Sequence, residues 1–253
     1  MKSGTSSLYA AMTDHPRIVW ARKKELHFFD GPRAVEGARA YRTSFPLRRE
    51  LRARRALTGE ATATYVFEPA VLPAVRAMLP DVKLIVSVRD PVDRAISHYF
   101  HEVRDARTET LPFAEAIAAE FSRATAAEAL LSAGAVPRHT FRGAYVARGM
   151  YADQLRAWTD VFPPEQLLVL VYEELVSAPA HNLAVVWDFL GIEDRPVELP
   201  HRNVGAKHAV DDDVVADLRE RFRAPNEELA DLLESVPVVR PPGPRVPAWA
   251  AHR

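Results

Sequence analysis

The sequence predicts an α/β fold in which helices cover both faces of a parallel sheet. Three short apolar runs are typical of buried strands: RIVWA (residues 17–21), VKLIVSV (82–88) and the run within QLLVLVYEEL (166–175). Segments with helical spacing alternate with these runs, as in folds built from parallel strands. Ligands of such folds lie at the carboxyl ends of the strands, so the residues that follow each run are the candidate site.

Two of the expected helices carry clear boundary signals. Apolar residues from Tyr151 to Phe162 recur at helical spacing, and Pro163 and Pro164 stop that helix. A second amphipathic helix near residues 183–190 is closed by Gly191, a residue that suits the left-handed position after a helix. These helices are expected to cover the sheet.

Composition favours one domain and excludes several classes of protein. With 253 residues, 48% of them hydrophobic, we expect one α/β domain over residues 1–236 and a proline-rich, extended tail over 237–253. A net charge of −1 gives no sign of nucleic-acid binding, and the absence of cysteine excludes disulfides and cysteine-ligated metals. No apolar run is long enough to cross a bilayer, so we expect no membrane partner and a cytoplasmic protein.

A basic stretch lies between residues 33 and 55, with eight arginines against two glutamates. We interpret it as a solvated face, because charge runs usually lie at the surface. The alternative is a basic rim that faces an anionic substrate.

The chain opens with a candidate anion-binding loop, MKSGTSSLYAAM. Gly4 permits a tight turn, residues 5–7 supply hydroxyl groups at the start of a helix, and Lys2 adds a cation. An ordinary helix cap is the alternative. The lysine precedes the only glycine of the loop, unlike the pattern of nucleotide triphosphatases, which disfavours a kinase or an ATPase.

A second candidate anion site follows the second strand, in RDPVDRAISHYF (residues 89–100). Asp90 and Pro91 are favourable residues for the start of a helix, which places Arg89 at the tip of the strand. Ser97 lies two turns into this helix and can share one anion with Arg89. The alternative is that Arg89 pairs with a nearby carboxylate.

Several spaced motifs, in this order, resemble one family. KSGTSSLY, KELHFFD and RDPVDRAISHY are similar to the sulfotransferases that use 3′-phosphoadenosine 5′-phosphosulfate (PAPS), closest to the branch with the heparan-sulfate enzymes and many bacterial relatives. The resemblance continues through GEATATY (59–65), RGMYADQLRAW (148–158), VYEEL and WDFLGI, and covers residues 2 to about 233. It implies a parallel sheet like that of P-loop NTPases, with PAPS as co-substrate and no metal.

The resemblance also implies roles for single residues. The 5′-phosphosulfate end of PAPS is assigned to Lys2, Ser3, Gly4, Thr5, Ser6 and Ser7, with Lys2 offsetting charge on the leaving phosphate. Arg89 and Ser97 match the pair that grips the 3′-phosphate, and the loosely aligned Lys207 and His208 match a late loop over the nucleotide. Glu25 matches the general base, with His27 as the fallback. The alternative for Glu25 is a surface carboxylate paired with Lys23 or Lys24.

Two departures from the family pattern qualify this interpretation. Members carry a buried strand before the first loop, whereas only Met1 precedes Lys2, so we expect a sheet that lacks this strand and has an unpaired edge. A misassigned start codon and a truncated, inactive relative are both open as explanations. Ala61 stands where glycan-modifying members often have lysine, which disfavours a heparan-type acceptor.

The predicted function is sulfuryl transfer from PAPS to a hydroxyl, or less favourably an amine, of a sugar or small metabolite. The alternative is a non-catalytic relative that binds nucleotide weakly or supports a partner protein. The sequence identifies neither the acceptor nor the oligomeric state.

Overall fold

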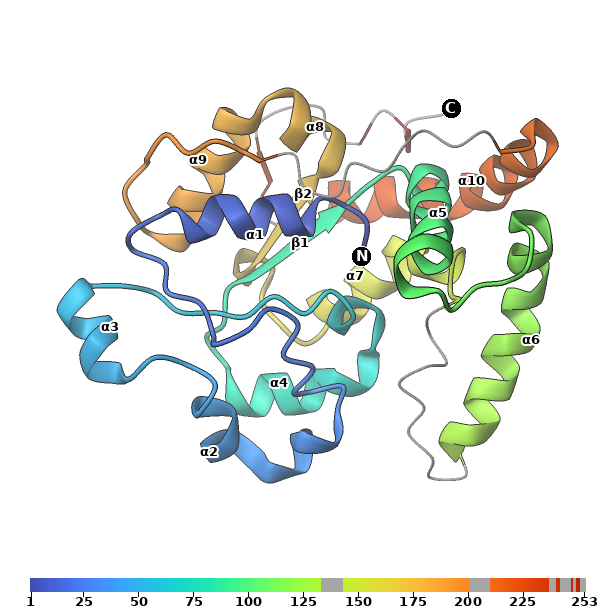
Figure 1. The fold of residues 1–253 in the computed structure, drawn as a ribbon. Coiled ribbons are helices and arrows are strands. Elements are labelled where there is room, and N and C mark those ends of the chain that lie inside the picture. The colour runs from blue at the N-terminus through green and yellow to red at the C-terminus, as the bar shows by residue number, and fades with distance from the viewer. Residues whose placement is uncertain (133–142, 201–209, 237–239, 242–246, 248, 251–253) are drawn as a thin grey trace.

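The computed structural model of the chain describes residues 1–253 except 133–142, 201–209, 237–239, 242–246, 248 and 251–253. Within the described part the fold is α/β, with two parallel strands surrounded by helices (Figure 1). The elements are α1 (Thr5–Thr13), α2 (Gly37–Arg42), α3 (Arg48–Arg54), α4 (Leu72–Met78), β1 (Leu84–Val88), α5 (Pro91–His101), α6 (Phe113–Ser132), α7 (Tyr151–Thr159), β2 (Leu167–Val171), α8 (Tyr172–Ser177), α9 (Pro179–Leu190) and α10 (Asp212–Ser235). None of the described helices is long and apolar enough to span a bilayer.

Strand β2 is covered on both faces, as its continuous apolar sequence predicts. All five of its residues are buried. Because successive side chains of a strand point to opposite faces, Leu168 and Leu170 pack with α1 and α9, whereas Leu167, Val169 and Val171 pack with α7 and α10. This two-sided packing fixes β2 at the centre of the fold.

Strand β1 differs from the prediction of a strand buried on both faces. It pairs in parallel with β2, from Leu84 with Leu167 to Val88 with Val171. Only Val88 is fully buried, and residues 84–87 remain half-exposed. In the described part of the chain no strand pairs with the other edge of β1, which is the unpaired edge that the sequence predicts.

The strand predicted at residues 17–21 forms only in part. Ile18 and Leu57 make an isolated parallel bridge, and Val19 and Ala21 donate to the carbonyls of Leu57 and Gly59 at 2.9 Å each. The segment therefore has one partner and no complete ladder. Beyond it the backbone of Glu25 turns into the left-handed region, with φ of 56°, which a regular strand does not permit.

The boundary residues of the predicted helices perform their expected roles. The Asp90 carboxylate accepts from the backbone N–H groups of Val92 and Asp93 at 2.9 and 3.0 Å, so α5 begins at Pro91. Gly191, with φ of 70°, closes α9. In the C-terminal region, Trp249 donates to the Glu173 carboxylate at 3.1 Å, so this part of the predicted tail lies against the domain.

Candidate active site

Helix α1 begins at the carboxyl end of β1 with an open N-terminus. Gly4 precedes its first residue with φ of 75°, and no side chain caps the helix. The first N–H groups of a helix have no partner within it and carry partial positive charge, so they attract an anion. A Cβ atom at position 4 would lie 2.6 Å from Cδ2 of Tyr172, so both the space and the backbone at this turn require glycine.

Arg89 contacts the loop that precedes α1. Its Nη1 donates to the carbonyl of Lys2 at 3.2 Å, and its guanidinium lies 4.8 Å from the centre of the Tyr172 ring. Ser87 Oγ donates to the carbonyl of Ser3 at 2.6 Å and ties the loop to β1. We refer to residues 2–7 with Arg89 as the donor end. The two anion sites that the sequence predicts are thus adjacent, although they are 82 residues or more apart in the chain.

Two features of the donor end suit a negatively charged ligand. Arg89 Nε is buried and has no hydrogen-bond partner in the described residues, while its Nη2 lies 3.5 Å from Asp93. Burial lowers the pKa of the Lys2 ammonium because the charged form loses water; Asp105 opposes this shift, and Arg104 and Arg89 add to it. An anion placed here would satisfy the arginine and favour the charged lysine.

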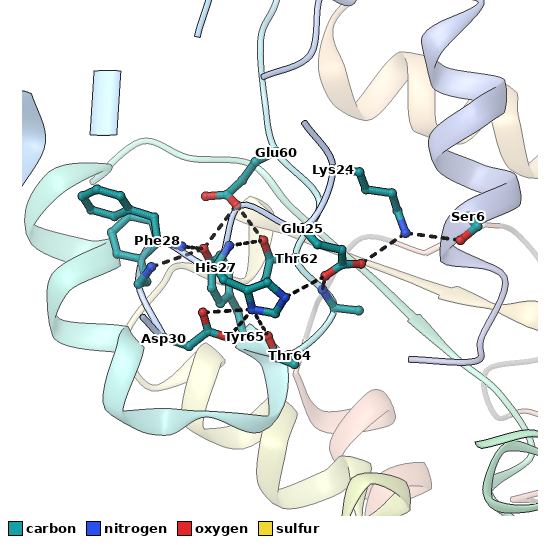
Figure 2. Close-up of polar contacts among 12 residues, drawn as sticks. Ser6, Lys24, Glu25, His27, Phe28, Asp30, Glu60, Thr62, Thr64 and Tyr65 are labelled. Atoms are coloured by element: carbon teal, nitrogen blue, oxygen red, sulfur yellow. Dashed lines mark hydrogen bonds and ion pairs between the residues drawn. The ribbon is translucent and has the colours of Figure 1, made fainter. Parts of the chain in front are cut away.

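Glu25 is held by backbone groups of residues 61–63 and by one lysine (Figure 2). Its N–H donates to the carbonyl of Ala61 at 3.0 Å, and its Oε2 accepts from the N–H of Ala63 at 3.0 Å. Its Oε1 lies 3.2 Å from Nζ of Lys24, which also donates to Ser6 Oγ at 3.2 Å. Lys24 therefore joins the carboxylate directly to the first turn of α1.

His27 lies between Glu25 and Asp30 (Figure 2). Its Nδ1 is 2.9 Å from Oδ2 of Asp30, and its Nε2 is 3.8 Å from Oε2 of Glu25. Burial alone would raise the pKa of Asp30, but hydrogen bonds from His27 and Thr64 outweigh it and hold this pKa below its usual range. An ionised Asp30 orients the imidazole ring and favours a proton on Nδ1.

A half-buried carboxylate, Glu60, supports this segment. Glu60 accepts hydrogen bonds from Tyr41, Thr62 and Tyr65 at 2.8, 2.8 and 3.2 Å. The Tyr65 hydroxyl in turn accepts from the N–H groups of Phe28 and Phe29 at 2.9 and 3.3 Å. Burial raises the pKa of Glu60. We refer to Glu25, His27 and Asp30 with the supporting residues 60–65 as the base end.

Comparison with known proteins decides the family. A family profile described as "Sulfotransferase domain" matches residues 1–204. This chain belongs to the sulfotransferase family. It is 37% identical over 193 residues to human heparan sulfate glucosamine 3-O-sulfotransferase 6, covering 76% of this chain and 50% of that protein. It is 29% identical over 199 residues to the bovine bifunctional heparan sulfate N-deacetylase/N-sulfotransferase 2, covering 76% of this chain and 21% of the relative.

A solved sulfotransferase has the same fold. The crystal structure of a sulfotransferase from Alicyclobacillus acidocaldarius superposes with a TM-score of 0.71 at 31% identity, and the match covers 92% of each chain. The predicted fold class is therefore confirmed. By contrast, this chain spans about half the length of the curated 3-O-sulfotransferase that it matches, and a smaller part of the bifunctional protein.

The structure of this sulfotransferase-family chain brings most of the predicted residues together. Lys2, Arg89 and residues 3–7 form the donor end, and Glu25 and His27 lie at the base end. Ser97 lies two turns into α5, where the sequence predicts it, and is half-buried. Lys207 and His208 fall outside the described residues. The individual roles remain predictions.

Asp30 and Tyr172 have no predicted role, and Lys24 is predicted only as an alternative ion-pair partner of Glu25, a pair that the structure contains. Asp30 ends the KELHFFD motif and Tyr172 lies within VYEEL, so both motifs held a signal for them. Lys24 could not be distinguished in the sequence, because Lys23 precedes it and is the same residue type. Only the structure separates the two lysines, since Lys23 is exposed and Lys24 is bound to Glu25 and Ser6.

Proposed function

We propose that this protein transfers a sulfuryl group from PAPS to a hydroxyl group, or less favourably an amine, of a sugar or small metabolite. In this reaction the bond from sulfur to the 5′-phosphate oxygen breaks and a bond from sulfur to the acceptor atom forms. The acceptor proton passes to the Glu25 carboxylate. The products are adenosine 3′,5′-bisphosphate and a sulfated acceptor.

One observation carries the proposal: Lys24 lies 3.2 Å from both Ser6 Oγ and Glu25 Oε1, so the first turn of α1 and the Glu25 carboxylate share one cation. A group that moves in line between two oxygens needs this arrangement, with the leaving oxygen at one side and the attacking oxygen at the other. Catalysis then consists mainly of positioning and charge stabilisation.

The donor end fits the bisphosphorylated part of PAPS. The uncapped terminus of α1 suits the 5′-phosphate, and the unpartnered Nε of Arg89 suits the 3′-phosphate. Lys2 then offsets the charge that develops on the departing phosphate. The hydrogen bond from Arg89 to the backbone carbonyl of Lys2 supports this assignment, because it makes the two residues neighbours.

The base end supplies proton transfer. Glu25 has both carboxylate oxygens occupied by donors, which fixes its orientation toward the donor end. His27 lies next to Glu25 and is hydrogen-bonded to Asp30 on its other side. His27 is the fallback acceptor of the proton. The sugar-directed names of the two curated relatives support a carbohydrate acceptor, although Ala61 disfavours one of the heparan type.

A transfer assay tests the proposal. The protein is incubated with PAPS and a panel of sugars and phenols, and the products are analysed by mass spectrometry. We expect a mass gain of one sulfuryl group on at least one acceptor. In parallel, thermal shift with adenosine 3′,5′-bisphosphate is compared with ATP and magnesium. Stabilisation by the bisphosphate without any transfer would favour the non-catalytic alternative, and stabilisation by magnesium-ATP alone would contradict both.

A further inference from the structure

Lys24 is held at a defined point although lysine side chains are flexible. Its Nζ donates to Ser6 Oγ and to Glu25 Oε1, each at 3.2 Å, and lies 6.0 Å from the centre of the Tyr9 ring. These partners belong to two segments, the helix α1 and the chain that carries the base. Its side chain is 26% exposed, so the ammonium keeps access to the site.

The position of this ammonium matches the path of the transferred group. If the 5′-phosphate binds at the start of α1 and the acceptor binds at Glu25, the sulfuryl group crosses between Ser6 and Glu25. Lys24 contacts both of these residues. An ammonium group has three donors, and these two contacts leave one for an oxygen of the sulfuryl group.

Among the described residues, Lys24 is the only lysine or arginine that forms an ion pair with Glu25, whose other charged neighbour is His27 at 3.8 Å. Glu25 pairs through its N–H with the carbonyl of Ala61, whose side chain is a methyl group. Lys2 forms no ion pair with Glu25 in the described structure, and its carbonyl accepts from Arg89 at 3.2 Å. Lys24 is therefore the permanently charged side chain nearest to Glu25, where the sulfuryl oxygens would lie.

We infer that Lys24 is a catalytic residue that binds the sulfuryl group itself, whereas Lys2 and Arg89 bind the nucleotide phosphates. This inference rests on the proposed function. The three cations then have different roles. Lys2 and Arg89 hold the part of PAPS that leaves as adenosine 3′,5′-bisphosphate, and Lys24 holds the sulfuryl group that is transferred. Lys24 also keeps the Glu25 carboxylate close to the group that its acceptor will attack.

The test compares two ligands that differ only in the sulfuryl group. Isothermal titration calorimetry measures the affinities of wild type, K24A, K24R and K23A for PAPS and for adenosine 3′,5′-bisphosphate. We expect K24A to weaken PAPS binding by about 10- to 100-fold, the usual range for a hydrogen bond to a charged group, and to leave bisphosphate binding unchanged. K24R retains part of the preference because it keeps the charge. K23A, which changes the exposed neighbouring lysine, retains all of it.

Each other outcome overturns the inference in a recognisable way. If K24A weakens both ligands equally, Lys24 acts only through the shape of the site, and thermal denaturation will show whether the fold has changed. If K24A alters neither affinity, the ammonium does not contact the sulfuryl group. If wild type binds neither ligand, the proposed function itself fails.

Discussion

The donor end and the base end of the site are built in different ways. The donor end lies next to regular elements: β1 ends at Val88, Arg89 comes next, and α1 begins directly after the left-handed residues Lys2 and Gly4, with φ of 63° and 75°. The base end lies on irregular chain, where Glu25 and His27 both have left-handed backbone, with φ of 56° and 49°. Side-chain hydrogen bonds to residues 60–65 hold it in place.

Because the two ends are built differently, we expect the donor end to control phosphate binding and the base end to control proton transfer. Phosphate binding depends on helix termini and strand tips, which the hydrophobic core positions. In the proposed reaction, proton transfer depends on one carboxylate, Glu25, whose position is set by a polar network. Changes at the donor end should therefore affect binding, and changes at the base end should affect turnover or stability.

The largest expected effect is at the base. Glu25→Gln keeps the shape of the side chain and removes its ability to accept a proton, so turnover should fall by about 10²- to 10⁴-fold. Affinity for adenosine 3′,5′-bisphosphate should not change. Steady-state transfer from PAPS and calorimetry measure the two quantities. The matched control is Glu36→Gln, an exposed carboxylate that pairs with Arg33. A normal transfer rate in Glu25→Gln would remove Glu25 from the mechanism.

The second effect is at the donor end. Arg89→Ala should weaken bisphosphate binding by about 10- to 100-fold, because it removes a charge-assisted contact to phosphate. Calorimetry with the bisphosphate measures this loss. Arg156→Ala is the control, since that exposed arginine pairs with Asp153 on the surface of α7. Equal affinities of wild type and Arg89→Ala would place the 3′-phosphate elsewhere.

The third effect concerns the network under the base end. Tyr65→Phe leaves the N–H groups of Phe28 and Phe29 without their acceptor and removes one donor to Glu60. We expect the free energy of unfolding to fall by about 1–3 kcal/mol, measured by urea denaturation. Tyr9→Phe, which removes a hydroxyl that has no hydrogen bond in the described structure, should change it little. A loss of the same size in both variants would show that the network does not stabilise this region.

The smallest effect is a dependence of stability on pH. Burial raises the pKa of Glu68 from 4.5 to about 7, against the attraction of Arg148. The folded state therefore retains a proton that the unfolded state loses above pH 4.5, so this group lowers the free energy of unfolding as pH rises from 4.5 to about 7. Glu68→Gln should remove this decline and be more stable than wild type above about pH 7. Denaturation curves at about pH 4, 6 and 8 measure it, and parallel pH profiles of the two proteins would contradict it.

The sequence predicted the donor end better than the base end, for a physical reason. Gly4, Asp90 and the apolar run of β2 act locally, so each predicts its own element. The predicted strand at 17–21 was wrong in extent, because strand pairing depends on a partner some 40 residues away. The contacts from Glu25 to Ala63 and from Tyr65 to Phe28 join residues 37 or 38 positions apart, with no periodic pattern to reveal them. For the same reason nothing in the sequence separates Lys24 from Lys23.

The left-handed backbone at Glu25 and His27 has a consequence for protein engineering. A side chain in this conformation costs about 1 kcal/mol or more, and glycine is the residue that avoids this cost. Glycine would also remove the hydrogen bonds that Glu25 makes with Ala63 and His27 makes with Asp30, and it loses more chain entropy on folding, so its net gain in stability is small. Such a substitution would remove the proposed proton acceptor or its proposed fallback, so engineering for heat resistance should leave positions 25 and 27 unchanged and act elsewhere in the chain.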